Sequence, residues 1–284
     1  METTLVFSDE LMTALTVLFI ACTVAPAFYY VWYVYKKKLN HAGMLAGLAA
    51  FFLCGYLLPS MLLGSFAPAD KSAEMAPAAY ALLRALLVAL PEVGGITVFL
   101  LFMSRRYSTV RVPIGFGLGF RLFDLLYLGA LNALFRLANA LTVNRDGLES
   151  LLESVDAASA PALVEQLELL AASAPKVYLM SAVDYVCMLV ISVVVARFIW
   201  YGLEGGKLEE DRRLILLAFV LRFVAEFLQA FYSVGGASYG LCAGIYYVLT
   251  ALAVCYCYYE ARRRDDPEKI HADHIQWKQH RRLR

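Results

Sequence analysis

The sequence predicts an all-α protein, a polytopic bundle of about seven transmembrane helices with its N-terminus outside and its C-terminus inside. Three observations support this fold class. Of the 284 residues, 61% are hydrophobic and 17% are charged, with a mean hydropathy of +0.63, which is typical of multi-pass membrane proteins. The apolar residues form stretches long enough to cross a bilayer. The basic residues gather in alternate connections between these stretches.

The predicted spans follow one another through short connections, except before the fifth. They are Leu11–Tyr35, Ala42–Leu63, Pro77–Met103, Pro113–Ala140, Val177–Tyr201, Leu214–Tyr232 and Leu241–Tyr259. The residues before the first span include Glu2, Asp9 and Glu10 and no basic residue, which is not the pattern of a signal peptide. We therefore expect the first span to be retained.

Basic residues predict the orientation, because short cytoplasmic loops are enriched in Lys and Arg. The chain has four clusters of basic residues near the ends of spans. Lys36–Lys38 follows the first span and Arg105 to Arg111 follows the third. Lys207 to Arg213 precedes the sixth span and Arg262–Arg264 follows the seventh. These positions all fall on one side of the membrane. We expect residues 1–260 to form the bundle and residues 261–284 to form a basic cytoplasmic tail.

The longest connection, residues 142–176, is expected on the extracytoplasmic side. Leucines at helical spacing predict two short amphipathic helices within it, separated near Ser159-Ala160-Pro161. Two roles are open for this segment. It is either a lid over an outer opening of the bundle or an interfacial cap that closes the helices.

The third span carries Pro91 and Glu92 near its middle. At ~1.5 Å per residue, Glu92 lies about 20 Å from either end of the apolar stretch, close to the membrane midplane. A carboxyl group at that depth costs about 2.5 kcal/mol or more unless it is neutral, paired or hydrated. Pro91 removes a helical hydrogen-bond donor and predicts a kink. The pair indicates either a functional site or a structural ion pair beside a kinked helix.

Further charged residues lie within the other predicted spans and elsewhere in the third: Arg84, Arg121, Asp124, Asp184, Arg222 and Glu226. Arg121 and Asp124 share a face of the fourth span because they are three residues apart. Arg222 and Glu226 share a face of the sixth span in the same way, four residues apart. Together with Glu92, these arginines and acids are nearly balanced, which predicts a buried charge network.

No cofactor or metal site is predicted. The histidines all lie outside the spans, and the cysteines all lie within them, where small packing residues are expected. The chain has neither a His-Glu-x-x-His motif nor a glycine-rich phosphate loop. A formal net charge of +1 gives no indication of a nucleic-acid partner. The expected partner is the lipid bilayer, and the pattern favours no particular oligomeric state.

Three motifs occur in an order that resembles a known family. They are Pro91-Glu92-Val93-Gly94-Gly95, Gly115-Phe116-Gly117-Leu118-Gly119 and Arg222-Phe223-Val224-Ala225-Glu226. The order is similar to that of the YhfC-type intramembrane peptidases, distant relatives of the glutamate-dependent CAAX-processing and PrsW-type membrane proteases. The seven-span arrangement also resembles the APH-1 subunit of gamma-secretase, a non-catalytic relative. The resemblance implies a multi-pass protein of the cell membrane, in bacteria the plasma membrane.

The resemblance also implies a catalytic set that this chain retains only in part. In the family pattern Glu-Glu-x-x-Arg, the two glutamates and the arginine correspond here to Pro91, Glu92 and Gly95. In Gly-x-Gly-His-Gly-Gly-x-Glu, the histidine and the glutamate correspond to Leu118 and Leu122. In His-x-x-x-Asp, the histidine and the aspartate correspond to Arg222 and Glu226. The candidate catalytic residues are therefore Glu92, Arg222 and Glu226. An arginine stays charged and cannot replace a titrating imidazole. The loss of both histidines implies a degenerate site with weak or absent activity.

Three functions fit these features. The first is a catalytically degenerate protein that binds a transmembrane peptide or a lipid-modified partner between the third, fourth and sixth spans. The second is an active glutamate-type intramembrane protease, with Glu92 as the base and Arg222 or Arg121 as the electrophile. The third is a transporter or sensor whose midplane charges line a polar path. The glycines near the start of the fourth span predict close backbone approach, or an irregular helix start beside a cavity.

Overall fold

The structure is a computed structural model that describes residues 5–36, 40–68, 74–107, 111–153, 155–156, 158–204 and 212–264. Within these residues every regular element is a helix, and seven helical segments are long and apolar enough to cross a membrane. This confirms the predicted all-α, multi-pass fold. Three of the basic residues used to predict the orientation, Lys37, Lys38 and Lys207, lie outside the described residues. The tail beyond Arg264 also lies outside them. The orientation stays a prediction.

The seven spans keep the predicted order and extend a few residues beyond most of the predicted ends. They are α1 (Asp9–Tyr35), α2–η1–α3 (His41–Ala50, Phe51–Leu57, Leu58–Phe66), α4 (Pro77–Ser104), α5–η3–α6 (Arg111–Phe123, Asp124–Leu131, Asn132–Asp146), α9 (Pro175–Glu204), α10 (Arg212–Ser233) and α11 (Tyr239–Arg264). The segments η1 and η3 are π-helical. π-helical turns within α-helices often lie at functional sites.

The helix starts follow local sequence rules. The Ser8 side chain accepts a hydrogen bond from the Leu11 amide at 3.3 Å, and the Asn40 side chain accepts one from the Gly43 amide at 2.9 Å. Side-chain oxygens at these positions satisfy amides that have no partner within the helix. In α4, Pro77 occupies the first turn, where a proline is tolerated, and the helix continues through Pro91.

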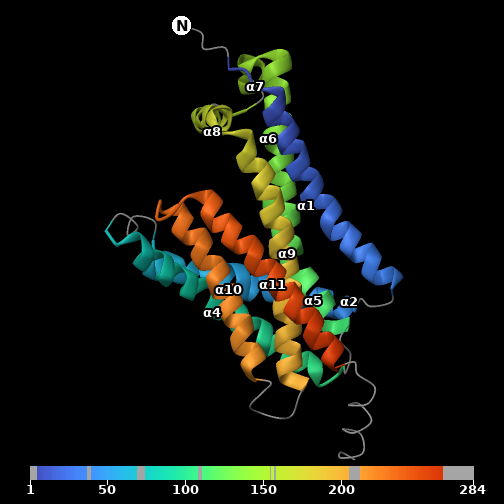
Figure 1. Ribbon diagram of the computed structural model, residues 1–284. Helices are drawn as coiled ribbons and strands as arrows, with labels where there is room; N and C mark the ends of the chain where they lie inside the picture. The colour runs from blue at the N-terminus through green and yellow to red at the C-terminus, as the bar shows by residue number, and fades with distance from the viewer. Residues whose placement is uncertain are drawn as a thin grey trace, which may run out of the picture.

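The helices pack around two main apolar cores. The larger core joins α2, η1, α4, α5, α9, α10 and α11, and its largest fully buried side chains are Phe51, Phe116, Phe120, Phe198 and Trp200. The second core joins α1 and α6 to the first half of α9 and to the two short helices α7 (Leu148–Glu153) and α8 (Ala160–Ala172). Figure 1 shows α7 and α8 at the far end of α6 and α9, away from the α4 and α10 side of the bundle. We call this the α7–α8 end.

Glycines let α5 lie against two neighbours at once. A Cβ atom on Gly119 would lie 1.9 Å from the carbonyl oxygen of Met44 in α2. A Cβ atom on Gly117 would lie 2.5 Å from Cα of Val193 in α9. The Ser192 hydroxyl also donates to the Gly117 carbonyl at 3.0 Å. The predicted close approach of backbones is confirmed, and it fixes the position of Arg121 one turn further along.

Candidate functional site

Glu92 lies inside the bundle, at the middle of α4. Its exposed fraction is 1%. The same helix face carries Ala85, Val88 and Ala89 on one side and Ile96 on the other, and all four are buried. A carboxylate so enclosed is stable only with strong partners from neighbouring helices.

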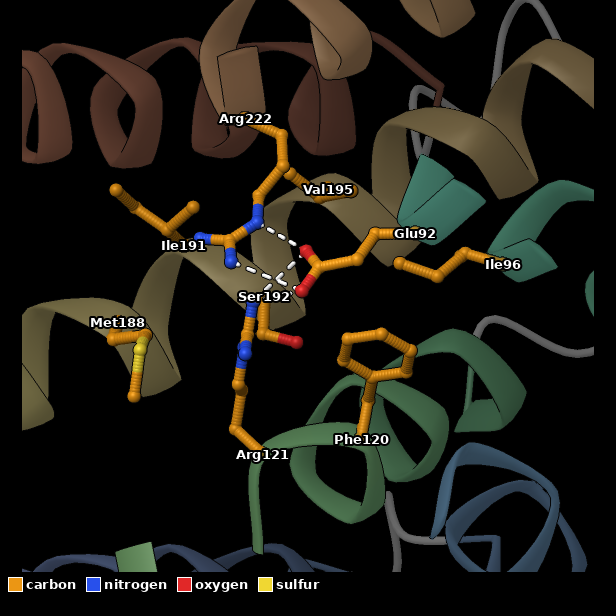
Figure 2. Close-up of a pocket in the computed structure, with 9 residues that line it drawn as sticks. All are labelled: Glu92, Ile96, Phe120, Arg121, Met188, Ile191, Ser192, Val195 and Arg222. Carbon is orange, nitrogen blue, oxygen red and sulfur yellow. Dashed lines mark hydrogen bonds and ion pairs between the residues drawn. The ribbon is translucent and has the colours of Figure 1, made fainter. Parts of the chain in front are cut away.

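Two arginines from different helices bind both oxygens of Glu92. Arg222 of α10 donates from Nε to Oε2 and from Nη2 to Oε1, the latter at 3.1 Å. Arg121 of α5 donates from Nη2 to Oε2 at 2.9 Å and to Oε1 at 3.1 Å. Figure 2 shows the two guanidinium groups approaching the carboxylate from different sides. The side chains of all three residues are at most 7% exposed.

Each arginine also holds a second acid on its own span. Arg121 donates from Nη1 to Asp124 at 2.6 Å, and Arg222 forms an ion pair with Glu226 through Nη2. Asp124 is the first residue of the π-helical segment η3. The site thus contains two guanidinium groups and three carboxylates, and we call these five residues the charge network.

A cavity of about 540 Å³ opens from the charge network toward the α7–α8 end. Its walls come from η1, α4, α5, η3, α9, α10 and α11. Both π-helical segments contribute, with Phe51, Gly55 and Tyr56 from η1 and Asp124 and Leu128 from η3. A second void beside Glu92 measures only about 10 Å³ and holds at most one water molecule.

The other predicted charged residues line the cavity apart from the network. The Asp184 carboxylate accepts hydrogen bonds from the hydroxyls of Tyr239 and Tyr247, the latter at 2.9 Å. Arg84 is exposed, and no ion pair joins it to any acid among the described residues. Sequence reasoning missed the two tyrosines. Tyr247 lies in the predicted seventh span and Tyr239 in the predicted connection before it, and neither position gives a signal that distinguishes a hydrogen-bond donor from an interfacial residue.

The connection between the fourth and fifth spans packs into the second core. None of the described residues of α7 or α8 lies on the cavity wall. Instead, Leu151 of α7 and Leu167 and Leu170 of α8 are buried in the second core. The side chain of Asn144 holds the residues just before α1 there, since it exchanges two hydrogen bonds of 2.8 Å with the backbone of Phe7. These contacts favour the cap over the lid.

A model of the YhfC intramembrane metalloprotease family matches residues 21–247 of this chain. The chain belongs to the YhfC family. No curated protein and no solved structure matches it. The matched residues contain the whole charge network and the cavity.

The metal that the family's description implies does not fit the residues present in this YhfC protein. No group of three or more His, Cys, Asp and Glu side chains in the described part of the chain is arranged to hold a metal ion. The acids of the charge network are already paired with Arg121 and Arg222, whose positive charges would repel a divalent cation. The single histidine in the described ranges, His41, begins α2 and lies against the ring of Tyr30. Among the residues that the structure describes, metal-assisted chemistry therefore has no ligand set.

Proposed function

We propose that this YhfC-family protein does not hydrolyse peptide bonds and that it binds a transmembrane peptide or a lipid-modified protein in the cavity beside Glu92. The observation that carries the proposal is the double capture of the Glu92 carboxylate by Arg121 and Arg222. The proposed location is the plasma membrane of a bacterium, as the resemblance to the family implies.

The hydrogen bonds to Glu92 leave no free acceptor site for a catalytic role. Each of its two oxygens accepts one bond from Arg121 and one from Arg222. A carboxylate has about four lone-pair sites in all, so these bonds use them. A general base needs a free lone pair directed at the proton that it removes, and a metal ligand needs one directed at the metal. Glu92 offers neither.

The cavity supports the binding role by its size and by its closed inner end. Its volume of about 540 Å³ lies in the range of about 300–1,000 Å³ that is usual for ligand sites. On the opposite side of Glu92, Ile96 and Leu100 are 2% and 0% exposed within the larger core. The cavity thus ends at the charge network. This geometry favours a bound ligand over a solute that passes through the bundle.

Hydrolysis is tested with the purified full-length protein and a panel of candidate membrane substrates, in parallel with Glu92→Ala. We expect the same product pattern from both proteins, because neither has an activated water. Cleavage by the natural protein that Glu92→Ala lacks would overturn the proposal.

Partner binding is tested in cells by photo-crosslinking. A photoreactive amino acid replaces Met188, which lines the cavity, and in a matched control it replaces Leu169 of α8, which is 63% exposed and lies away from the cavity. We expect a discrete adduct, identified by mass spectrometry as a membrane-embedded or lipid-modified segment, from position 188 only. Equal adducts from both positions, or none from position 188, would contradict the binding role.

A further inference from the structure

The part of the cavity nearest the α7–α8 end carries polar groups that the charge network does not use. Asp184 of α9, Tyr239 of α11 and Tyr232 of α10 all lie on its wall. We infer that this part of the cavity binds an organic ammonium ion, with its positive charge at Asp184 and its alkyl groups against the tyrosine rings. The inference concerns the same cavity as the proposed function, but it does not depend on the identity of a protein partner.

Asp184 differs from the acids of the charge network in its partners. Glu92, Asp124 and Glu226 each form an ion pair with an arginine. Asp184 accepts hydrogen bonds from two tyrosine hydroxyls, and no basic side chain in the described ranges lies within ion-pair distance of it. Hydroxyl donors orient a carboxylate without neutralising it. A charge in this position, inside a membrane span, is stabilised by a counter-charge.

The charges on the cavity wall sum to an excess of acid. Among the described residues of the wall, four carboxylates face three guanidinium groups, and Arg121 and Arg222 are both engaged by the charge network. The third, Arg84, is an exposed side chain near the start of α4, and it forms no ion pair among the described residues. One monovalent cation at Asp184 would therefore neutralise the cavity.

Aromatic side chains make an organic cation a better fit than a metal ion. The wall includes six of them: Phe51, Tyr56, Tyr185, Tyr232, Tyr239 and Tyr246. The rings of Tyr232 and Tyr239 lie 4.9 Å apart between centroids and are tilted by 58°. Aromatic faces attract ammonium groups, most strongly where water is excluded. A metal ion would instead need several oxygen or nitrogen ligands, and the described residues form no such group.

The test measures binding of choline to the full-length protein in nonionic detergent, by isothermal titration calorimetry. The matched probe is 3,3-dimethylbutan-1-ol, which has the same shape as choline but carries no charge. We expect choline to bind and its uncharged analogue to bind at least tenfold more weakly. Absence of choline binding, or equal binding of the two probes, would overturn the inference.

Two variants locate the bound charge. Asp184→Asn keeps the shape of the side chain and should weaken choline binding at least tenfold. Asp146→Asn, at the end of α6 with a half-exposed side chain, is the matched control and should leave binding unchanged. If Asp184→Asn does not fold, Tyr232→Leu takes its place, with an expected loss of about three- to fivefold from one aromatic face. Unchanged choline affinity in the folded variant would overturn the inference.

The source of the ammonium group is tested in nanodiscs. Choline affinity is measured in phosphatidylglycerol alone and in phosphatidylglycerol mixed with phosphatidylcholine. Weaker apparent affinity in the mixed lipid would assign the ligand to lipid headgroups, because the headgroup then competes for Asp184. Equal affinity would assign it to water-soluble amines. Partner crosslinking at position 188 is scored separately, so that failure of one proposal does not decide the other.

Discussion

Arg222 and Glu92 lie 130 positions apart in the sequence and form a two-point contact inside the bundle, with Nε and Nη2 of the guanidinium bound to the two carboxylate oxygens. Arg121 binds the same carboxylate from α5. One acid at the middle of α4 thereby connects three spans. The arrangement neutralises Glu92 by fixed charges, and the same contacts occupy the groups that a catalytic mechanism would need.

The first prediction concerns the unequal numbers of acids and bases in the charge network. Arg222→Gln leaves three carboxylates with one guanidinium group, and we expect it to lower the free energy of unfolding by about 3–5 kcal/mol. Glu92→Gln leaves Arg121 with Asp124 and Arg222 with Glu226, so each remaining charge keeps a partner. Its expected cost is about 1–2 kcal/mol. The two losses are measured by denaturant titration in detergent, and a larger loss for Glu92→Gln would contradict this account.

The second prediction uses two adjacent glycines of α4. A Cβ atom on Gly95 would lie 2.4 Å from Sγ and from Cβ of Cys54 in η1, whereas a Cβ atom on Gly94 would meet nothing within 4 Å. Alanine favours a helix over glycine by about 1 kcal/mol at either position. We therefore expect Gly94→Ala to leave the protein equally or more stable, and Gly95→Ala to destabilise it by about 1–3 kcal/mol through overpacking. Equal melting temperatures for the two variants would show that η1 does not approach α4 so closely.

The third prediction concerns orientation in the membrane. In a variant whose native cysteines are replaced, single cysteines are introduced by Asp146→Cys at the end of α6 and by Lys36→Cys at the end of α1. The loop charges predict that position 146 lies outside and position 36 lies inside. We expect a membrane-impermeant maleimide to label position 146 in intact cells and position 36 only after permeabilisation. The reverse pattern would invert the proposed topology.

The sequence was informative wherever one helix alone determines the feature. Apolar length located all seven spans, because a bilayer sets a minimum number of residues that local sequence directly shows. The spacings of Arg121 with Asp124 and of Arg222 with Glu226 likewise indicated pairs that the structure contains. Such contacts depend only on the period of a helix.

The sequence pattern could not predict features that depend on how the helices are rotated and placed relative to one another. The balance of charges favoured a network around Glu92, but it did not indicate that Arg121 and Arg222 would bind the same carboxylate. The hydrogen bonds from Tyr239 and Tyr247 to Asp184 join α11 to α9, and no spacing rule connects those positions. The π-helical segments η1 and η3 also had no sequence signal, because their residues read as ordinary apolar helix.

The most direct test of the capture of Glu92 is a double-mutant cycle with Glu92→Gln, Arg222→Gln and the double variant, each unfolded by denaturant in the same detergent. We expect Arg222→Gln to cost less when Glu92 is already replaced, with a coupling free energy of about 1–3 kcal/mol between the two positions. Additive losses, with a coupling below about 0.5 kcal/mol, would contradict the claim that Arg222 neutralises Glu92.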